Sequence, residues 1–182
     1  MRVRLRSESG FGLIELLMAM VMLNVGILAI VASYNAGIIS LKRASKLSTA
    51  ATLADAQMEQ YRALTWAAIA LDPSTIPATA PYTTDTAYST TEVTGTCSGA
   101  LAQHNECNAS RVVTGPDRKP YRVDSYVVLS TASTTPPTPA NGRPLRIVTV
   151  VVRDGNNLSG RPLARLAATF DSSTAGGCAP DC

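Results

Sequence analysis

The sequence predicts an α+β protein in which one long N-terminal helix packs on a small antiparallel β-sheet. Two observations carry this prediction. An apolar run near the N-terminus is about twenty residues long, which is enough to cross a hydrocarbon core of roughly 30 Å as a helix. Toward the C-terminus, three segments rich in β-branched residues follow one another with turn residues between them.

Composition limits the classes of protein that fit this chain. Its 182 residues allow one exported domain and one membrane helix. Charged residues make up 16% of the chain and aromatic residues 5%, which is low for a cytosolic enzyme and for an aromatic ligand pocket. The net charge is only +3, and the basic residues have no aromatic residues interleaved with them. Nucleic-acid binding therefore receives little support.

The N-terminal end combines a basic leader with an apolar segment. We expect residues 1–10 to be a leader peptide and residues 11–32 to form a transmembrane helix. The leader contains Arg2, Arg4 and Arg6. One carboxylate, Glu15, lies near the start of the apolar segment. A charged side chain within a membrane is costly unless it is paired, so Glu15 is a candidate functional residue.

The junction between leader and helix reads Gly10-Phe11-Gly12-Leu13-Ile14-Glu15-Leu16-Leu17. It resembles the processing site of type IV prepilins and of type II secretion pseudopilins, in which Gly, Phe, Thr, Leu, Ile and Glu precede an apolar helix. Gly12 departs from the usual Thr, which loosens the first helical turn. The resemblance covers the leader and the long helix and is only general beyond them.

The resemblance implies a processing reaction and an assembly contact. A prepilin peptidase would cut between Gly10 and Phe11 and methylate the new amine of Phe11. In a stack of subunits, the carboxylate of Glu15 would neutralise the amine of a neighbour's Phe11, since either charge would be costly alone in apolar surroundings. The alternative is that Glu15 only lies at the membrane interface.

Two other interpretations of the apolar segment stay open, an ordinary cleaved signal peptide and an uncleaved anchor. The segment is longer than a signal core and ends in Ala29-Ile30-Val31-Ala32, a poor cleavage site. Basic residues lie on both sides of it, but Lys42, Arg43 and Lys46 are farther from the membrane than the leader arginines. We therefore expect a single-pass protein of the inner membrane with a cytoplasmic N-terminus.

Beyond the membrane, residues 33–71 are predicted to continue the helix as an amphipathic segment. Apolar side chains recur at steps of three and four residues, and no proline interrupts them. The predicted apolar face consists of Ile38, Leu41, Leu47, Ala51, Ala54, Met58, Tyr61 and Leu64. Asp72-Pro73 should end the helix, because the residue before a proline avoids the helical conformation.

Residues 72–120 are expected to form a variable loop region, and residues 173–182 a C-terminal tail. Each contains two of the four cysteines, Cys97 and Cys107 in the first and Cys178 and Cys182 in the second. An even number of cysteines beyond a membrane helix predicts disulfides. Proximity in sequence favours the pairs Cys97–Cys107 and Cys178–Cys182. A long-range pairing and a metal site that includes His104 are the alternatives.

Residues 121–172 are predicted to form the antiparallel sheet. Strands are expected at residues 121–131, 145–153 and 162–170, and residues 111–113 are a candidate short edge strand. The turn sequence Asp154-Gly155-Asn156-Asn157 separates the last two predicted strands. One face of such a sheet must be covered, and the amphipathic helix is the only available partner.

No catalytic motif is present in the sequence, so neither enzyme activity nor a cofactor is expected. The favoured function is a structural minor pilin subunit that is incorporated into a type IV pilus or primes its assembly, and so reaches the cell surface. Its partners would be the prepilin peptidase, other pilin subunits, the inner-membrane assembly platform and membrane lipid. The alternatives are a type II secretion pseudopilin and a membrane-anchored adhesin or DNA-uptake module. DNA binding would require a basic patch on the domain. The candidates for such a patch are Arg111, Arg118, Lys119, Arg122, Arg143, Arg146, Arg153, Arg161 and Arg165.

Overall fold

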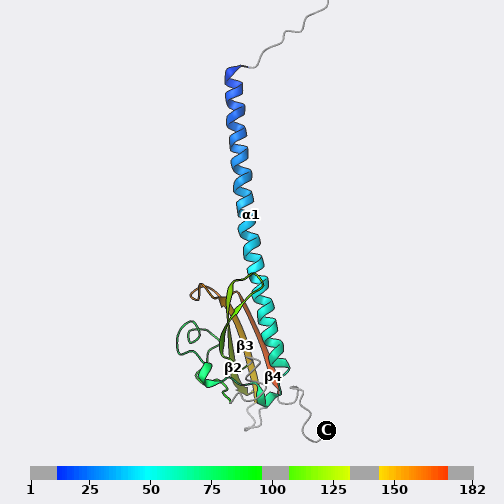
Figure 1. The fold of residues 1–182 in the computed structure, drawn as a ribbon, viewed down its shortest axis with the longest axis vertical. Coiled ribbons are helices and arrows are strands. Elements are labelled where there is room, and N and C mark those ends of the chain that lie inside the picture. Colours follow the sequence, from blue (N-terminus) through cyan, green and yellow to red (C-terminus); the bar gives the residue numbers. More distant parts are fainter. Residues whose placement is uncertain (1–11, 96–106, 132–143, 172–182) are drawn as a thin grey trace, which may run out of the picture. The chain divides into compact units, whose positions relative to one another are not determined.

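A computed structural model of the chain describes residues 12–95, 107–131 and 144–171. It confirms the predicted α+β class, with one long helix and a four-stranded antiparallel sheet (Figure 1). The chain divides into two compact units, residues 1–44 and residues 45–182. The long helix α1, Leu13–Arg62, contributes residues to both units.

In the first unit, α1 begins immediately after Gly12. The carbonyl of Gly12 accepts hydrogen bonds from the backbone N–H groups of Glu15, at 3.0 Å, and Leu16, at 3.2 Å. Every residue from 12 to 37 is exposed. As predicted, the segment is apolar on all sides, which is typical of a helix surrounded by lipid or by other apolar helices rather than by water.

The predicted end of the helix was wrong by several residues, because α1 stops at Arg62 and not near residue 71. The N–H of Ala63 is shared between the carbonyls of Glu59, at 3.1 Å, and Gln60, at 3.2 Å, so the last turn tightens. Beyond a short 3₁₀-helix, η1 at Trp66–Ala68, the chain extends so that Leu71 can pair with Val93 and Gly95. Tertiary pairing thus overrides local helix propensity.

Within the second unit, residues 45–62 of α1 pack on the sheet. The fully packed side chains are Ala50, Ala54, Gln57, Met58 and Tyr61. Three members of the predicted apolar face, Leu41, Leu47 and Ala51, are exposed instead. Small side chains at the contact bring the helix backbone close to the sheet, and in a segment so rich in alanine the sequence pattern does not fix which side faces inward.

The sheet has the strand order β1-β2-β3-β4, an antiparallel meander. The strands are β1 Ser110–Thr114, β2 Pro120–Thr131, β3 Pro144–Asp154 and β4 Ala164–Asp171. The three predicted strands and the candidate edge strand are therefore all present. The long β2–β3 pair runs from Tyr121 opposite Asp154 to Thr131 opposite Pro144.

Both faces of the sheet are covered, although only one covering element, the amphipathic helix, was predicted from the sequence. On the first face, Arg111 of β1 donates to Gln57 Oε1 of α1 at 2.7 Å. On the second face, the ring of Tyr82 stacks on Tyr126 of β2 with centroids 4.4 Å apart. The segment of residues 71–95, predicted as a loop, is therefore a second layer over the sheet. It includes the short 3₁₀-helix η2, Pro73–Thr75.

Candidate functional site

The predicted processing site lies largely outside the described residues. Gly10 and Phe11 belong to the N-terminal stretch that the structure does not describe, so cleavage and methylation stay predictions. Glu15 is described, and it lies exposed in the first turn of α1. A carboxylate there is favourable, because the first turn of a helix carries a partial positive charge.

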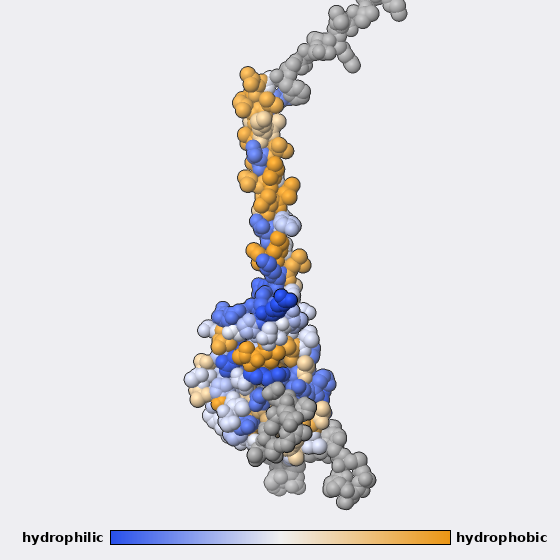
Figure 2. Space-filling model, viewed as in Figure 1, coloured by the Kyte–Doolittle hydropathy of each residue, from blue (hydrophilic) through white to orange (hydrophobic). Residues whose placement is uncertain are grey.

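The apolar segment behind Glu15 is the largest exposed hydrophobic surface among the described residues (Figure 2). Leu13 is 82% exposed, and Ile30 is 71% exposed. By its length and composition, α1 can span a membrane, and none of its apolar window is buried within the chain. Contiguous apolar surface of this extent marks a site of contact with lipid or with another protein.

Two residues interrupt this apolar segment. The side chain of Asn24 donates to the carbonyl of Met20, one turn earlier, at 2.9 Å. A hydrogen bond within the helix therefore satisfies one amide hydrogen of Asn24. A methyl group added at Gly26 would meet no other atom within 4 Å. Nothing in the part of the chain that the structure describes therefore requires glycine at this position.

One of the four cysteines falls within the described residues. Cys107 is 3% exposed and is disulfide-bonded. Cys97, Cys178, Cys182 and His104 lie outside the described residues, so the predicted pairings stay predictions. Within the described part of the chain, no group of three or more His, Cys, Asp or Glu residues is placed to hold a metal ion.

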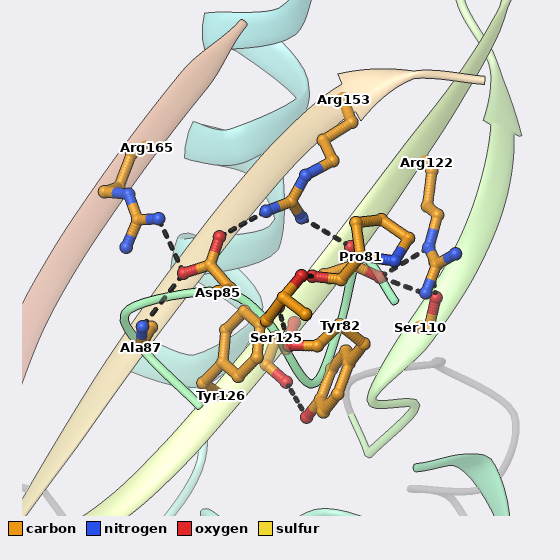
Figure 3. Close-up of polar contacts among 12 residues, drawn as sticks. Pro81, Tyr82, Asp85, Ala87, Ser110, Arg122, Ser125, Tyr126, Arg153 and Arg165 are labelled. Carbon is orange, nitrogen blue, oxygen red and sulfur yellow. Dashed lines mark hydrogen bonds and ion pairs between the residues drawn. The ribbon is translucent and has the colours of Figure 1, made fainter. Parts of the chain in front are cut away.

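The second unit contains a buried ion-pair network on the face of the sheet away from α1 (Figure 3). Arg153 of β3 lies between two carboxylates: its Nη1 donates to Asp124 Oδ2 at 2.8 Å, and its Nη2 donates to Asp85. Arg122 Nε also donates to Asp124, at 2.8 Å. Arg165 Nη2 donates to Asp85 Oδ1 at 2.6 Å. The network connects three strands to the covering segment.

Asp85 is the link between the sheet and the covering segment. Its side chain is 2% exposed. Burial alone would raise the pKa of Asp85, but the N–H of Ala87 and the guanidinium groups of Arg165 and Arg153 donate to the carboxylate and lower the pKa below its ordinary value. Asp85 is therefore held as an anion, and Arg153 and Arg165 balance its charge.

A pocket of about 510 Å³ opens beside this network. Its polar side chains come from the covering segment and from the β3–β4 hairpin, and prolines and a leucine form the rest of the wall. The lining residues are Ala80, Pro81, Thr84, Asp85, Thr86, Arg153, Leu158, Ser159, Gly160, Pro162 and Arg165. The volume lies within the range of small-molecule binding sites.

A second acidic group, the half-buried Glu92, lies in the same covering segment. Both of its carboxylate oxygens are 3.0 Å from the hydroxyl of Tyr82, which also lies 2.8 Å from the carbonyl of Ser125. Burial raises the pKa of Glu92 to about 7, although the hydrogen bond with Tyr82 acts in the opposite direction. The phenol has one proton, which it can donate to only one of these acceptors at a time.

Comparisons with known protein families, with curated proteins and with solved structures give no match. The functional argument therefore rests on the residues of this chain.

The structure also shows where the basic residues of the domain lie. Arg111 bonds to Gln57, Arg122 and Arg153 are ion-paired with Asp124, and Arg146 lies 4.1 Å from the centroid of the Trp66 ring. These guanidinium groups belong to internal contacts on both faces of the sheet. Arg143, another member of the suggested basic patch, lies outside the described residues. The arrangement gives no support to a single DNA-binding face.

Neither the network nor the pocket was predicted from the sequence. Asp154, interpreted from sequence as a turn residue, forms an ion pair with Lys46 of α1. One available signal was the pair Asp124 and Arg153, which are charged residues within otherwise apolar strands. A buried charge requires a partner, so these two residues predicted ion pairing inside the sheet. Asp85, in a segment rich in Pro and Thr, gave no such signal.

Proposed function

We propose that this chain is a structural minor pilin subunit, processed by a prepilin peptidase and either incorporated into a type IV pilus or required to prime its assembly. One observation carries the proposal. A helix segment with every residue from 12 to 37 exposed has a single carboxylate, Glu15, in its first turn, and it follows a basic leader and a Gly10–Phe11 junction. The segment requires other apolar surface to cover it.

The proposed assembly step follows from the cost of exposing this segment to water. Each Å² of apolar surface that another helix covers is worth roughly 25 cal/mol when the reference state is water. In lipid that gain is absent, so packing and polar pairing between helices must favour association. The carboxylate of Glu15 and the N-terminal amine of a neighbouring subunit would supply such a pair, and each would otherwise be a costly charge.

The test is intact-mass measurement and N-terminal sequencing of the protein from its native membrane, with and without the peptidase. We expect a product that begins at methylated Phe11 only when the peptidase is present. Gly10→Val should retain residues 1–10, whereas Glu15→Gln should be cleaved but absent from sheared fibres. A wild-type chain that retains its leader, or that is cut after Ala32, would overturn the proposal.

A membrane-anchored binding module, such as an adhesin, is a second candidate function. The pocket of about 510 Å³ beside Asp85 and Arg165 favours it, because this volume lies within the range of small-molecule binding sites. The two candidates are compatible, since a minor pilin can also carry a ligand site. The DNA-uptake form of this candidate is disfavoured by the internal pairing of the arginines.

A further inference from the structure

The pocket beside the ion-pair network has the charge and the donors of a small-molecule site. We propose that it binds an acidic sugar unit, that is, a hydroxylated ring with one carboxylate, and that Arg165 receives the carboxylate. The proposal concerns the second unit alone and does not depend on processing or on fibre assembly. It assigns a ligand class to a surface of the domain that is separate from the membrane helix.

The charge balance of the network favours an anion. Three arginines, Arg122, Arg153 and Arg165, share two aspartates, Asp85 and Asp124, so the network has one positive charge in excess. Arg153 lies between both aspartates with a side chain that is only 5% exposed. Arg122 is bound to Asp124 on the β1 side of the sheet and does not line the pocket. The excess charge is therefore accessible at Arg165.

The geometry of Arg165 leaves donors for a ligand. One of its nitrogens, Nη2, donates to Asp85, and 38% of its side chain is exposed. A guanidinium group has five N–H donors arranged to match the two oxygens of a carboxylate. Asp85 holds Arg165 in place and is itself held by Arg153 and by the N–H of Ala87 at 2.9 Å. The cation is thus oriented before any ligand binds.

The remaining walls favour a sugar acid over a phosphate or a bare carboxylate. A phosphate dianion would place two negative charges against one excess positive charge and next to the buried carboxylate of Asp85. The hydroxyls of Thr86 and Ser159 line the pocket and can pair with ring hydroxyls. Leu158 and Pro162 supply apolar surface for the face of a ring. The volume of about 510 Å³ exceeds what a lone carboxylate would fill.

The experiment is calorimetric titration of the full chain in neutral detergent with three probes: galacturonic acid, its methyl ester and an acetylated dipeptide with a free carboxylate. We expect saturable binding of the acid and at least tenfold weaker binding of the ester, because the ester cannot accept a charge-assisted pair from Arg165. The dipeptide should bind more weakly than the acid, since it lacks ring hydroxyls.

Three variants distinguish specific binding in the pocket from nonspecific electrostatic attraction of an anion. Arg165→Gln and Ser159→Phe, which narrows the pocket without changing charge, should each weaken binding at least tenfold. The matched control Arg161→Gln removes the same charge from the same hairpin outside the pocket lining and should change binding less than threefold. Fluorescence of Trp66, the single tryptophan, shows whether each variant is folded.

Four results would overturn the proposal. They are no saturable binding of the acid at millimolar concentration, equal binding of acid and ester, equal loss in Arg165→Gln and Arg161→Gln, and tighter binding of the dipeptide than of the acid. The last result would assign the pocket to polypeptide carboxylates instead. None of these results bears on cleavage at Gly10, so failure of this proposal and failure of the pilin proposal are distinguishable.

Discussion

The two ends of helix α1 have the same backbone but opposite surroundings. Residues 13–37 present leucine, isoleucine, valine and methionine on all sides and bury none of them within the chain. Residues 45–62 carry fewer large apolar side chains, yet Ala50, Ala54, Met58 and Tyr61 are almost fully buried against the sheet. The more hydrophobic half is thus the half that no other described residue covers.

This contrast separates two uses of apolar side chains. In the second unit, small residues on one helix face let the sheet approach closely, and their burial stabilises the domain. In the first unit, large residues on every face provide a surface that only lipid or other subunits can cover. Substitutions that change stability should therefore cluster in the second unit, and substitutions in the first should affect insertion or assembly.

The largest expected effect is on the buried network of the second unit. Arg153→Leu would leave Asp85 and Asp124 without their shared cation, and removal of one partner from a buried pair typically costs about 3–5 kcal/mol of unfolding free energy. Urea unfolding followed by Trp66 fluorescence reports on this unit alone, because the chain has one tryptophan. The control Arg161→Leu, at an exposed position of the same hairpin, should stay within about 0.5 kcal/mol of wild type.

If Arg153→Leu and Arg161→Leu unfolded at the same urea concentration, the network would not stabilise the second unit as proposed. The register of β2 and β3 makes that outcome unexpected. It places Arg122 directly opposite Arg153, so two like charges face each other across the strands unless Asp124 lies between them. Asp124 therefore offsets the repulsion between Arg122 and Arg153 that the pairing of β2 with β3 creates.

The next effect tests which side of α1 faces the sheet. Ala54→Leu inserts a larger side chain at a position with 0% exposure and should cost about 1–3 kcal/mol through overpacking. Ala51→Leu places the same side chain one turn earlier at an exposed position and should be nearly neutral. Ala29→Leu, in the apolar segment, should also leave the unfolding of the second unit unchanged.

The same urea titration compares these three variants. Equal destabilisation by Ala51→Leu and Ala54→Leu would show that both positions face the sheet, which contradicts the exposure of Ala51 in the structure. It would restore the face predicted from sequence, which included both residues.

The strands and the class of fold were predictable, because β-branched runs such as residues 145–153 have few alternatives to a strand. The end of α1 was not predictable, since it depends on pairing between Leu71 and Val93, far apart in sequence. Arg146 adds to this ending: its Nη1 donates to the carbonyls of Trp66 at 2.5 Å and Ile69 at 2.7 Å. Contacts between residues so far apart in the chain cannot be predicted from a local sequence pattern.

The candidate sites differ in the same way. Gly10, Phe11 and Glu15 stand in a contiguous motif that can be read directly from the sequence. The pocket is assembled from residues 80–86 and 153–165, which folding alone brings together. The role of Asp85 in the pocket follows only from its contacts with Arg153 and Arg165. The sequence around Asp85 therefore does not predict that role.

A smaller effect concerns the pH dependence of the second unit. The pKa of Glu92 is raised to about 7 by burial, so the folded state binds a proton at this site more tightly than the unfolded chain does. The stabilisation from this group is present below the ordinary pKa of glutamate and is lost as the pH rises toward 7. Glu92→Gln should remove this loss, on the order of 1 kcal/mol because the carboxyl is only partly buried.

The measurement is the difference in unfolding free energy between Glu92→Gln and wild type at pH 4 and pH 8. The difference should favour the variant more at pH 8. Other carboxyl groups, such as Asp85 and Asp154, have lowered pKa values and lose stability toward acid, but they are present in both proteins and cancel. The control is Thr91→Val, next to Glu92 at an exposed position, which removes no ionisable group, so the difference should not change between the two pH values. An equal difference at both pH values for Glu92→Gln would contradict the raised pKa of this half-buried carboxyl group.

The smallest effect concerns the turn between β1 and β2. Arg118 has a φ of 59°, in the left-handed region that disfavours residues with a Cβ atom. Its N–H donates to the carbonyl of Gly115 at 2.9 Å, which closes the turn and holds this conformation. Arg118→Gly should therefore stabilise the second unit by about 0.5 kcal/mol, since relief of the steric cost exceeds the added entropy of the unfolded chain. The neighbouring Lys119→Gly gains no such relief and should destabilise the unit. If both glycine variants lowered the urea midpoint equally, the turn would not be strained at Arg118, and the left-handed residue would be tolerated at no measurable cost.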